Sequence, residues 1–116
     1  MSNRRIVSLF TTILLLIAYS CQSHEQKYAG TWSSSEDKIV VNLDAYTMKA
    51  YVTIRLGDTP VSYTSDWEYV EGHGALFNNY YGHGQASIIG YDGKLYSFDS
   101  YSGQKSYDGV ILRHSK

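Results

Sequence analysis

The sequence predicts an all-β protein, in which a small antiparallel up-and-down β-barrel of about eight strands follows a cleaved signal peptide. Two observations predict the barrel. Short runs with apolar side chains at every second position recur along the chain, which is typical of strands that bury one face. Turn residues separate these runs, and all ten glycines and the only proline lie beyond residue 28. Closing such a meander removes its exposed edges, so a barrel is the favoured arrangement.

The N-terminal residues predict a signal peptide. Arg4 and Arg5 precede an apolar run over 6–19. As a helix, this run would rise only about 21 Å, which is too short for a hydrocarbon core of about 30 Å. Basic residues followed by an apolar stretch of this length are typical of a secretory leader.

The chain's only cysteine, Cys21, directly follows the apolar run, behind Ala18-Tyr19-Ser20. This arrangement resembles a bacterial lipobox, in which the cysteine becomes the lipidated first residue of the mature protein. The resemblance implies a palmitate-bearing lipoprotein of the bacterial cell envelope that faces the periplasm or the exterior, with the outer membrane favoured over the inner. Several acyl chains would hold the domain stably on a membrane, since each buried methylene contributes about 0.8 kcal/mol. The alternative is an ordinary leader followed by a stray thiol.

The expected organisation is a lipoprotein signal peptide over 1–20, a lipidated N-terminus and polar tether over 21–27, and one barrel domain over 28–116. Without Arg4 and Arg5, eight of the ten basic residues remain against eleven acidic ones, a formal charge of about −3. This balance argues against a nucleic-acid partner, which requires a basic surface. Because no cysteine follows Cys21, the exported domain would fold without a disulfide.

Alternation of side chains assigns the strands of the domain. It is clearest over 61–71, where the odd positions from Tyr63 to Tyr69 form a mostly aromatic face opposite polar residues. Other strands are expected over 28–34, 38–44 and 49–56, in the arms of a hairpin around Asn78-Asn79, over 86–91 and 94–99, and near 106–114. Turns are expected at 44–47, 57–60 and 100–105, and Asp92-Gly93 predicts a two-residue type I′ hairpin.

Both ends of the domain carry short motifs. Gly30-Thr31-Trp32 opens the first strand, and Arg113 lies in the last one. This pattern resembles the lipocalins, and in particular the small lipocalin-like lipoproteins of Bacteroidetes-type bacteria, many of which are domains of unknown function. The resemblance implies that Gly30, Trp32 and Arg113 form a barrel clasp, with the Arg113 guanidinium stacked on the Trp32 indole.

The tripeptide GHG occurs at 72–74 and again at 82–84. With a two-residue turn at Asn78-Asn79, His73 and His83 would point to opposite faces and could not share a metal ion. A three-residue loop over 78–80 would place them on one face, about 7 Å apart and within reach of Glu71. We favour the first register, in which the glycines ease bends at both ends of an aromatic-tipped hairpin and no metal binds. A lid over the barrel mouth is a further alternative.

The sequence contains no pattern that strongly favours an enzyme. Asp66 and Glu68 lie on one strand face about 6–7 Å apart, a spacing that glycosidase carboxylates use. Adjacent acids on a polar strand face are more often simply solvated. No local nucleophile motif and no phosphate-binding glycine loop occurs. We therefore expect a protein that is not an enzyme and needs no cofactor.

The expected function is binding of a small apolar ligand or a partner at one end of the barrel. The candidate binding residues are aromatic: Tyr63, Trp67, Tyr69, Phe77, Tyr80 and Tyr81. The alternative is a glycan-binding or inhibitory protein-interaction module with a filled barrel. A cavity of about 300 Å³ or more favours ligand binding, and a solid interior favours the interaction module.

Overall fold

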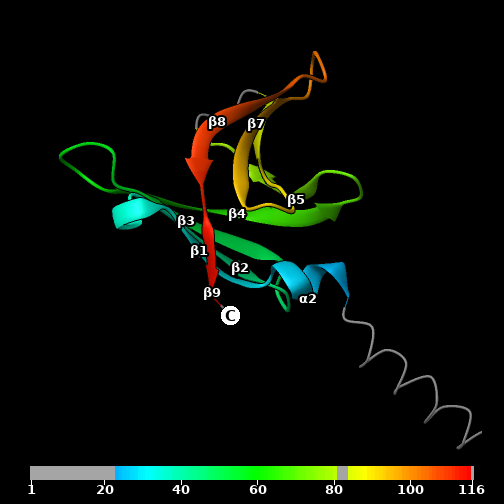
Figure 1. The fold of residues 1–116 in the computed structure, drawn as a ribbon, viewed down its shortest axis with the longest axis horizontal. Coiled ribbons are helices and arrows are strands. Elements are labelled where there is room, and N and C mark those ends of the chain that lie inside the picture. Colours follow the sequence, from blue (N-terminus) through cyan, green and yellow to red (C-terminus); the bar gives the residue numbers. More distant parts are fainter. Residues whose placement is uncertain (1–22, 81–83, 116) are drawn as a thin grey trace, which may run out of the picture.

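The computed structural model describes residues 23–80 and 84–115 (Figure 1). The signal peptide expected over 1–20 and the lipidation site Cys21 lie outside the described residues, as do Tyr81 and His83. In the described part, no helix has the length and apolar character needed to cross a membrane.

The described residues form one antiparallel sheet of nine strands. The strands are β1 (Gly30–Ser33), β2 (Ile39–Asp44), β3 (Lys49–Ile54), β4 (Val61–Val70), β5 (Gly74–Asn78), β6 (Gln85–Ile89), β7 (Lys94–Asp99), β8 (Lys105–Ile111) and β9 (Arg113–Ser115). Helix α2 (His24–Tyr28) precedes them, and the 3-10 turn η1 (Ser35–Asp37) joins β1 to β2. The strand order is β8-β7-β6-β5-β4-β3-β2-β1-β9.

The last part of the chain closes the sheet on itself. Only Leu112 separates β8 from β9, and the chain pairs first with β7 and then with β1. At this crossing, Leu112 N donates a hydrogen bond of 2.8 Å to Gly93 O. The result is a nearly closed antiparallel barrel (Figure 1), which confirms the predicted all-β barrel. The single last strand expected near 106–114 is divided into β8, which pairs with β7, and β9, which pairs with β1.

The predicted alternation over β2, β3 and β4 is confirmed. The buried side chains of these strands are Val41, Leu43, Ala50, Val52, Ser65 and Trp67. They occupy every second position, and all of them except Ser65 share one hydrophobic core with Phe77, Ile89, Leu95 and Leu112. A slip of one residue would turn this set toward solvent, so burial holds the register of these strands.

The hairpin formed by β5 and β6 differs from both expected registers. Phe77 pairs with Ser87 and Asn78 with Ala86, so the connection runs over 79–84. Neither a two-residue turn at Asn78-Asn79 nor a three-residue loop over 78–80 is present, and both predictions were wrong. Tertiary burial is the physical reason, because this register directs Phe77 into the barrel core.

The turn between β6 and β7 is also longer than predicted. Gly90 N donates to Lys94 O, which closes a loop over 91–93. Of Asp92 and Gly93, only Gly93 has a positive φ, of 80°. A type I′ turn requires positive φ at both central residues, so the predicted two-residue turn was wrong.

The N-terminal segment is more ordered than a polar tether. Ser23 caps α2, with its Oγ accepting a hydrogen bond of 3.2 Å from Gln26 N. Tyr28 ends the helix and is 5% exposed. Its ring lies 5.7 Å from that of Trp32, whose Nε1 donates a hydrogen bond of 2.8 Å to Tyr28 O. The helix therefore covers one end of the barrel, and the first strand begins at Gly30 rather than at residue 28.

Candidate functional site

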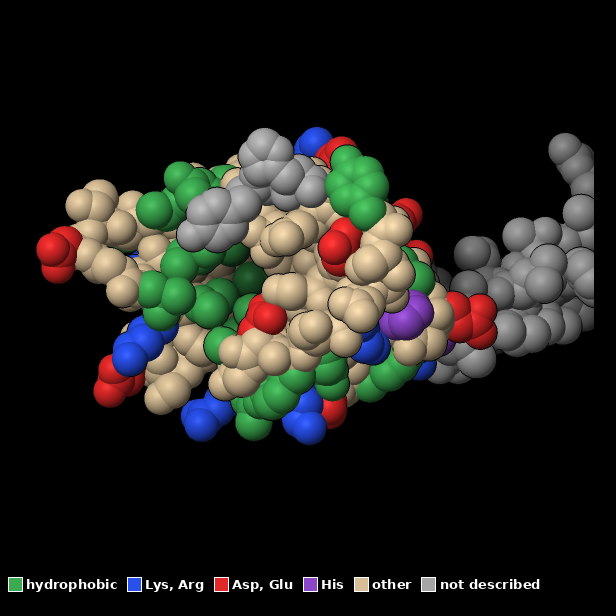
Figure 2. Space-filling view, turned by 90° about the horizontal axis from the view of Figure 1, so that it is seen from above, with side chains coloured by type: hydrophobic (Ala, Val, Ile, Leu, Met, Phe, Trp, Pro, Cys, Tyr) green, Lys and Arg blue, Asp and Glu red, His purple; other side chains and the backbone are tan. Residues whose placement is uncertain are grey.

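The barrel contains a cavity of about 370 Å³ at the end opposite α2. Its rim comes from the connections β3–β4 and β5–β6, through Leu56, Gly57, Thr59, Asn79 and Tyr80. Figure 2 shows hydrophobic side chains gathered around a hollow near the projecting β3–β4 connection. The strand ends that meet there are the starts of β2 and β4 and the ends of β3 and β5, as antiparallel pairing requires.

The wall of this cavity is mostly aliphatic and aromatic. Val41, Val52, Phe77 and Leu95 form its deep part, and each is at most 7% exposed. Ile39, Ile54 and Val61 continue the wall toward the rim. These residues are the inward members of alternating strands, so the same pattern that forms the core also forms the binding surface.

Polar side chains of β6 and β8 interrupt this apolar wall. Ser87 on β6 pairs with Ser97 on β7, and Ser87 lies on the cavity wall. The hydroxyl of Ser97 donates to the carboxylate of Asp108 on β8, at 2.8 Å from Oδ1 and 3.0 Å from Oδ2. Asp108 also lies on the cavity wall. Ser87 and Asp108 thus lie on the cavity wall, and Ser97, on the strand between them, binds the Asp108 carboxylate.

A β-bulge in β8 contains Asp108, which lies on the cavity wall. Leu95 pairs with Val110 while Tyr96 pairs with Tyr107, so Asp108 and Gly109 are extra residues on the β8 side. Gly109 has a φ of 80°, which a residue without a Cβ adopts at little cost. The dipeptide Asp-Gly at 108–109 is the sequence signal that could have indicated this bulge, and our sequence reasoning missed it.

Three of the six aromatic candidates line the cavity, namely Tyr63, Phe77 and Tyr80. The hydroxyl of Tyr63 donates a hydrogen bond of 2.9 Å to Asn78 O, which ties β4 to the end of β5. Burial raises the pKa of Tyr63 to about 12, so this phenol stays neutral. The rings of Tyr63 and Tyr80 lie 5.7 Å apart at the rim.

The other candidates lie elsewhere. Trp67 is 3% exposed in the core, and its Nε1 donates a hydrogen bond of 3.0 Å to Asp44 O. Tyr69 stacks on His24 of α2 at 4.3 Å and bonds to the Tyr91 hydroxyl at 2.7 Å, at the covered end of the barrel. Tyr81 lies outside the described residues. The expected aromatic face of β4 therefore divides between the open end, the core and the covered end.

The expected barrel clasp has a different partner for Trp32. In the β1–β9 pairing, Trp32 lies opposite His114, and the two rings stack at 4.0 Å with an interplanar angle of 5°. Arg113 pairs with Ser33 and is exposed, so the predicted stacking of Arg113 on Trp32 was wrong. Alternation is the reason, because neighbouring strand residues point to opposite faces. Gly30 enters β1 with a φ of 118°.

The metal alternative receives no support from the described residues, in which no group of three potential ligand side chains gathers. His73 is exposed beside the β4–β5 turn, and its Nδ1 lies 3.4 Å from the Lys105 ammonium. Glu71 is exposed in the same turn, and His83 lies outside the described residues. Asp66 and Glu68 are exposed on the outer face of β4, where Asp66 pairs with Lys49.

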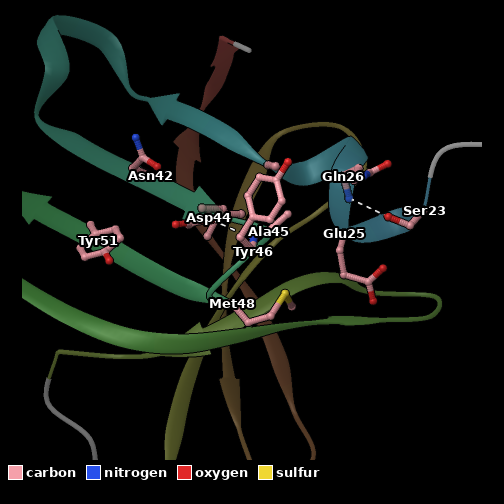
Figure 3. Close-up of a pocket in the computed structure, with 11 residues that line it drawn as sticks. Ser23, Glu25, Gln26, Asn42, Asp44, Ala45, Tyr46, Met48 and Tyr51 are labelled. Carbon is pink, nitrogen blue, oxygen red and sulfur yellow. Dashed lines mark hydrogen bonds between the residues drawn. The ribbon is translucent and has the colours of Figure 1, made fainter. Parts of the chain in front are cut away.

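A second hollow, of about 780 Å³, lies on the surface between α2 and the β2–β3 hairpin (Figure 3). Its polar groups serve the local fold. Asp44 Oδ1 accepts a hydrogen bond of 2.8 Å from Tyr46 N, and this bond lowers the pKa of Asp44. Ser23 caps α2 at the opposite side of the hollow. Tyr46 is 99% exposed, so this groove encloses a ligand far less than the barrel cavity does.

Comparison of the chain with protein-family models, with curated proteins and with solved structures finds no match. The fold and the site together define the class as a small antiparallel β-barrel, covered by a helix at one end and hollow and apolar at the other.

Proposed function

We propose that this protein is a lipocalin-like binding protein that holds a small apolar ligand in the open end of its barrel and catalyses no reaction. The observation that carries the proposal is the apolar cavity of about 370 Å³, which exceeds the lower bound of about 300 Å³ typical of small-molecule sites. The filled barrel of the alternative interaction module would have no such space.

The wall supports binding without reaction. A ligand there would contact Val41, Val52 and Phe77 and would be removed from water, which contributes about 25 cal/mol per Å² of apolar surface. Among the described wall residues, Asp108 is the only ionisable group apart from tyrosines. A single carboxylate is less than the acid–base pair or activated nucleophile that hydrolytic sites use.

We further propose that Cys21 carries the lipid anchor and that the cavity opens away from the membrane. Only residue 22 separates Cys21 from Ser23, the cap of α2, and one extended residue spans about 3.5 Å. Helix α2 covers the end of the barrel opposite the cavity. An anchored domain would therefore lie close to the bilayer with its covered end nearest, and its ligand would arrive from the aqueous side.

Binding of 1-octanol tests the proposed function. We expect a saturable, one-to-one calorimetric titration of the mature domain. Val52→Phe places a larger side chain in the cavity and should weaken binding at least about tenfold, because overpacked sites cannot relax freely. Val40→Phe is the matched control, since Val40 precedes an inward residue of β2 and pairs with Ser33 and Thr53 on the outer face. Equal affinity in all three proteins, or no binding to the parent domain, would reject the cavity as the site.

A further inference from the structure

We propose that the cavity selects apolar molecules whose polar end donates hydrogen bonds or carries a positive charge, such as aliphatic amines, and that Asp108 receives this end. The inference rests on the proposed function and names the ligand class of the same site. It excludes the fatty carboxylates that an apolar cavity would otherwise accept.

Two hydroxyls at the cavity direct their protons at acceptors of the protein, although Thr59, Asn79, Tyr80 and Ser87 on the wall carry donors as well. The Ser97 proton is directed at the Asp108 carboxylate, and the Tyr63 proton is directed at Asn78 O. What these groups still offer to a ligand is oxygen lone pairs. A carboxylate has about four acceptor sites, and the Ser97 hydroxyl occupies only part of that capacity. A hydrogen-bond donor on the ligand would occupy one of the remaining acceptor sites of Asp108.

The charge of the described wall has one sign. Asp108 is its only charged side chain, and no lysine, arginine or histidine is among the described residues of the wall. Asp108 is exposed, so a ligand carboxylate beside it would meet a like charge that solvent screens in part, and the repulsion would still weaken its binding. An ammonium group would instead form a charge-assisted hydrogen bond.

The cations near the rim have partners of their own. Lys38 lies 3.7 Å from the Glu36 carboxylate, and Arg55 donates a hydrogen bond of 3.0 Å to the backbone oxygen of Asp37. Asp58, on the β3–β4 connection, adds a further negative charge beside the rim residue Gly57. Because Glu36, Asp37 and Asp58 outnumber Lys38 and Arg55, these charges near the mouth do not offset that of Asp108.

The volume limits the size of the ligand. At about 30 Å³ for each water-sized group, the cavity of about 370 Å³ corresponds to roughly a dozen non-hydrogen atoms. Eight-carbon chains with one polar group fall within this limit. Octylamine, 1-octanol and octanoate have similar apolar surfaces and differ mainly in the charge and hydrogen bonding of the polar end, so comparison of the three tests the contribution of Asp108.

The experiment is calorimetric titration of the mature domain at pH 7 with octylamine, 1-octanol and octanoate. We expect octylamine to bind about five- to tenfold more tightly than 1-octanol, and octanoate to bind most weakly. In Asp108→Asn, the preference for octylamine should disappear while the affinity for 1-octanol stays within about twofold of the parent. Asparagine keeps an oxygen that accepts the Ser97 proton, and a urea melt checks that the variant remains folded.

Glu68→Gln is the matched control, because it removes the same charge from the outer face of β4. It should leave all three affinities unchanged. If the three ligands bind equally, or if Asp108→Asn keeps the preference for octylamine, the selectivity inference is wrong and the proposed function stands. If none of the three binds, the proposed function itself fails.

Discussion

The imidazole of His114 lies flat on the indole of Trp32, with 4.0 Å between ring centroids, and joins the last strand to the first. Its Nε2 lies 2.8 Å from Ala29 O and donates a hydrogen bond to it. We expect His114→Ala to lower the free energy of unfolding by about 1–3 kcal/mol, because the stacking and the hydrogen bond are both lost. Arg113→Ala should cost less than about 0.5 kcal/mol, as is usual for an exposed side chain.

Urea denaturation of the two variants measures both values. His114→Phe retains a ring on Trp32 but cannot donate to Ala29 O, so it should fall between the parent protein and His114→Ala. A larger loss of stability in Arg113→Ala than in His114→Ala would contradict a role for the Trp32–His114 stack in closing the barrel.

Tyr28 has a buried hydroxyl without a hydrogen-bond partner among the described residues. Because an unsatisfied buried polar group costs free energy, Tyr28→Phe should leave stability unchanged or raise it by up to about 1 kcal/mol. Tyr69→Phe is the comparison, since it removes a hydroxyl that bonds to Tyr91 at 2.7 Å. It should lower the midpoint of urea unfolding. A destabilised Tyr28→Phe with an unaffected Tyr69→Phe would contradict this account of the covered end.

Stability should fall at alkaline pH. Burial raises the pKa values of Tyr28 and Tyr63 to about 12, whereas an unfolded tyrosine titrates near 10. Between these values the unfolded chain has released its phenolic protons and the folded chain has not, so rising pH favours unfolding. The contribution is fully present below pH 10 and is lost as the pH rises through 12.

Tyr63→Phe removes one of these groups, so its stability should decline less steeply between pH 10 and pH 12 than that of the parent protein. Urea midpoints across this range measure the slope. Tyr46→Phe is the control, because the Tyr46 side chain is 99% exposed and its removal should not change the slope. Equal slopes for Tyr63→Phe and the parent would show that the phenol of Tyr63 does not contribute.

Lipidation is tested on the full-length chain. The parent protein should fractionate with membranes, and Cys21→Ser should accumulate as an unprocessed or soluble form, because serine cannot carry the thioether-linked lipid. Ser20→Thr, a conservative change beside the cysteine, is a milder comparison. Identical fractionation and identical mass of Cys21→Ser and the parent would reject the anchor.

Strand alternation was accessible from the sequence because it is a local property. Each of β2, β3 and β4 repeats an apolar side chain at every second position, and no distant part of the chain is needed to detect this pattern. The short helix α2 was not predicted, since five residues are too few to show a helical period. The turn residues indicated where strands end, but not how many residues each connection contains.

Local patterns in the sequence were enough to indicate the all-β class, the strand faces and the short motifs at the two ends of the domain. Tertiary contacts decide which residue meets Trp32, which aromatic side chains reach the cavity, and that Asp108 lies on its wall and binds Ser97. These contacts depend on the register between strands, and the bond from His114 to Ala29 joins residues that are 85 positions apart. Register follows from burial of the whole set of inward side chains and from closure of the barrel, which a local pattern does not contain.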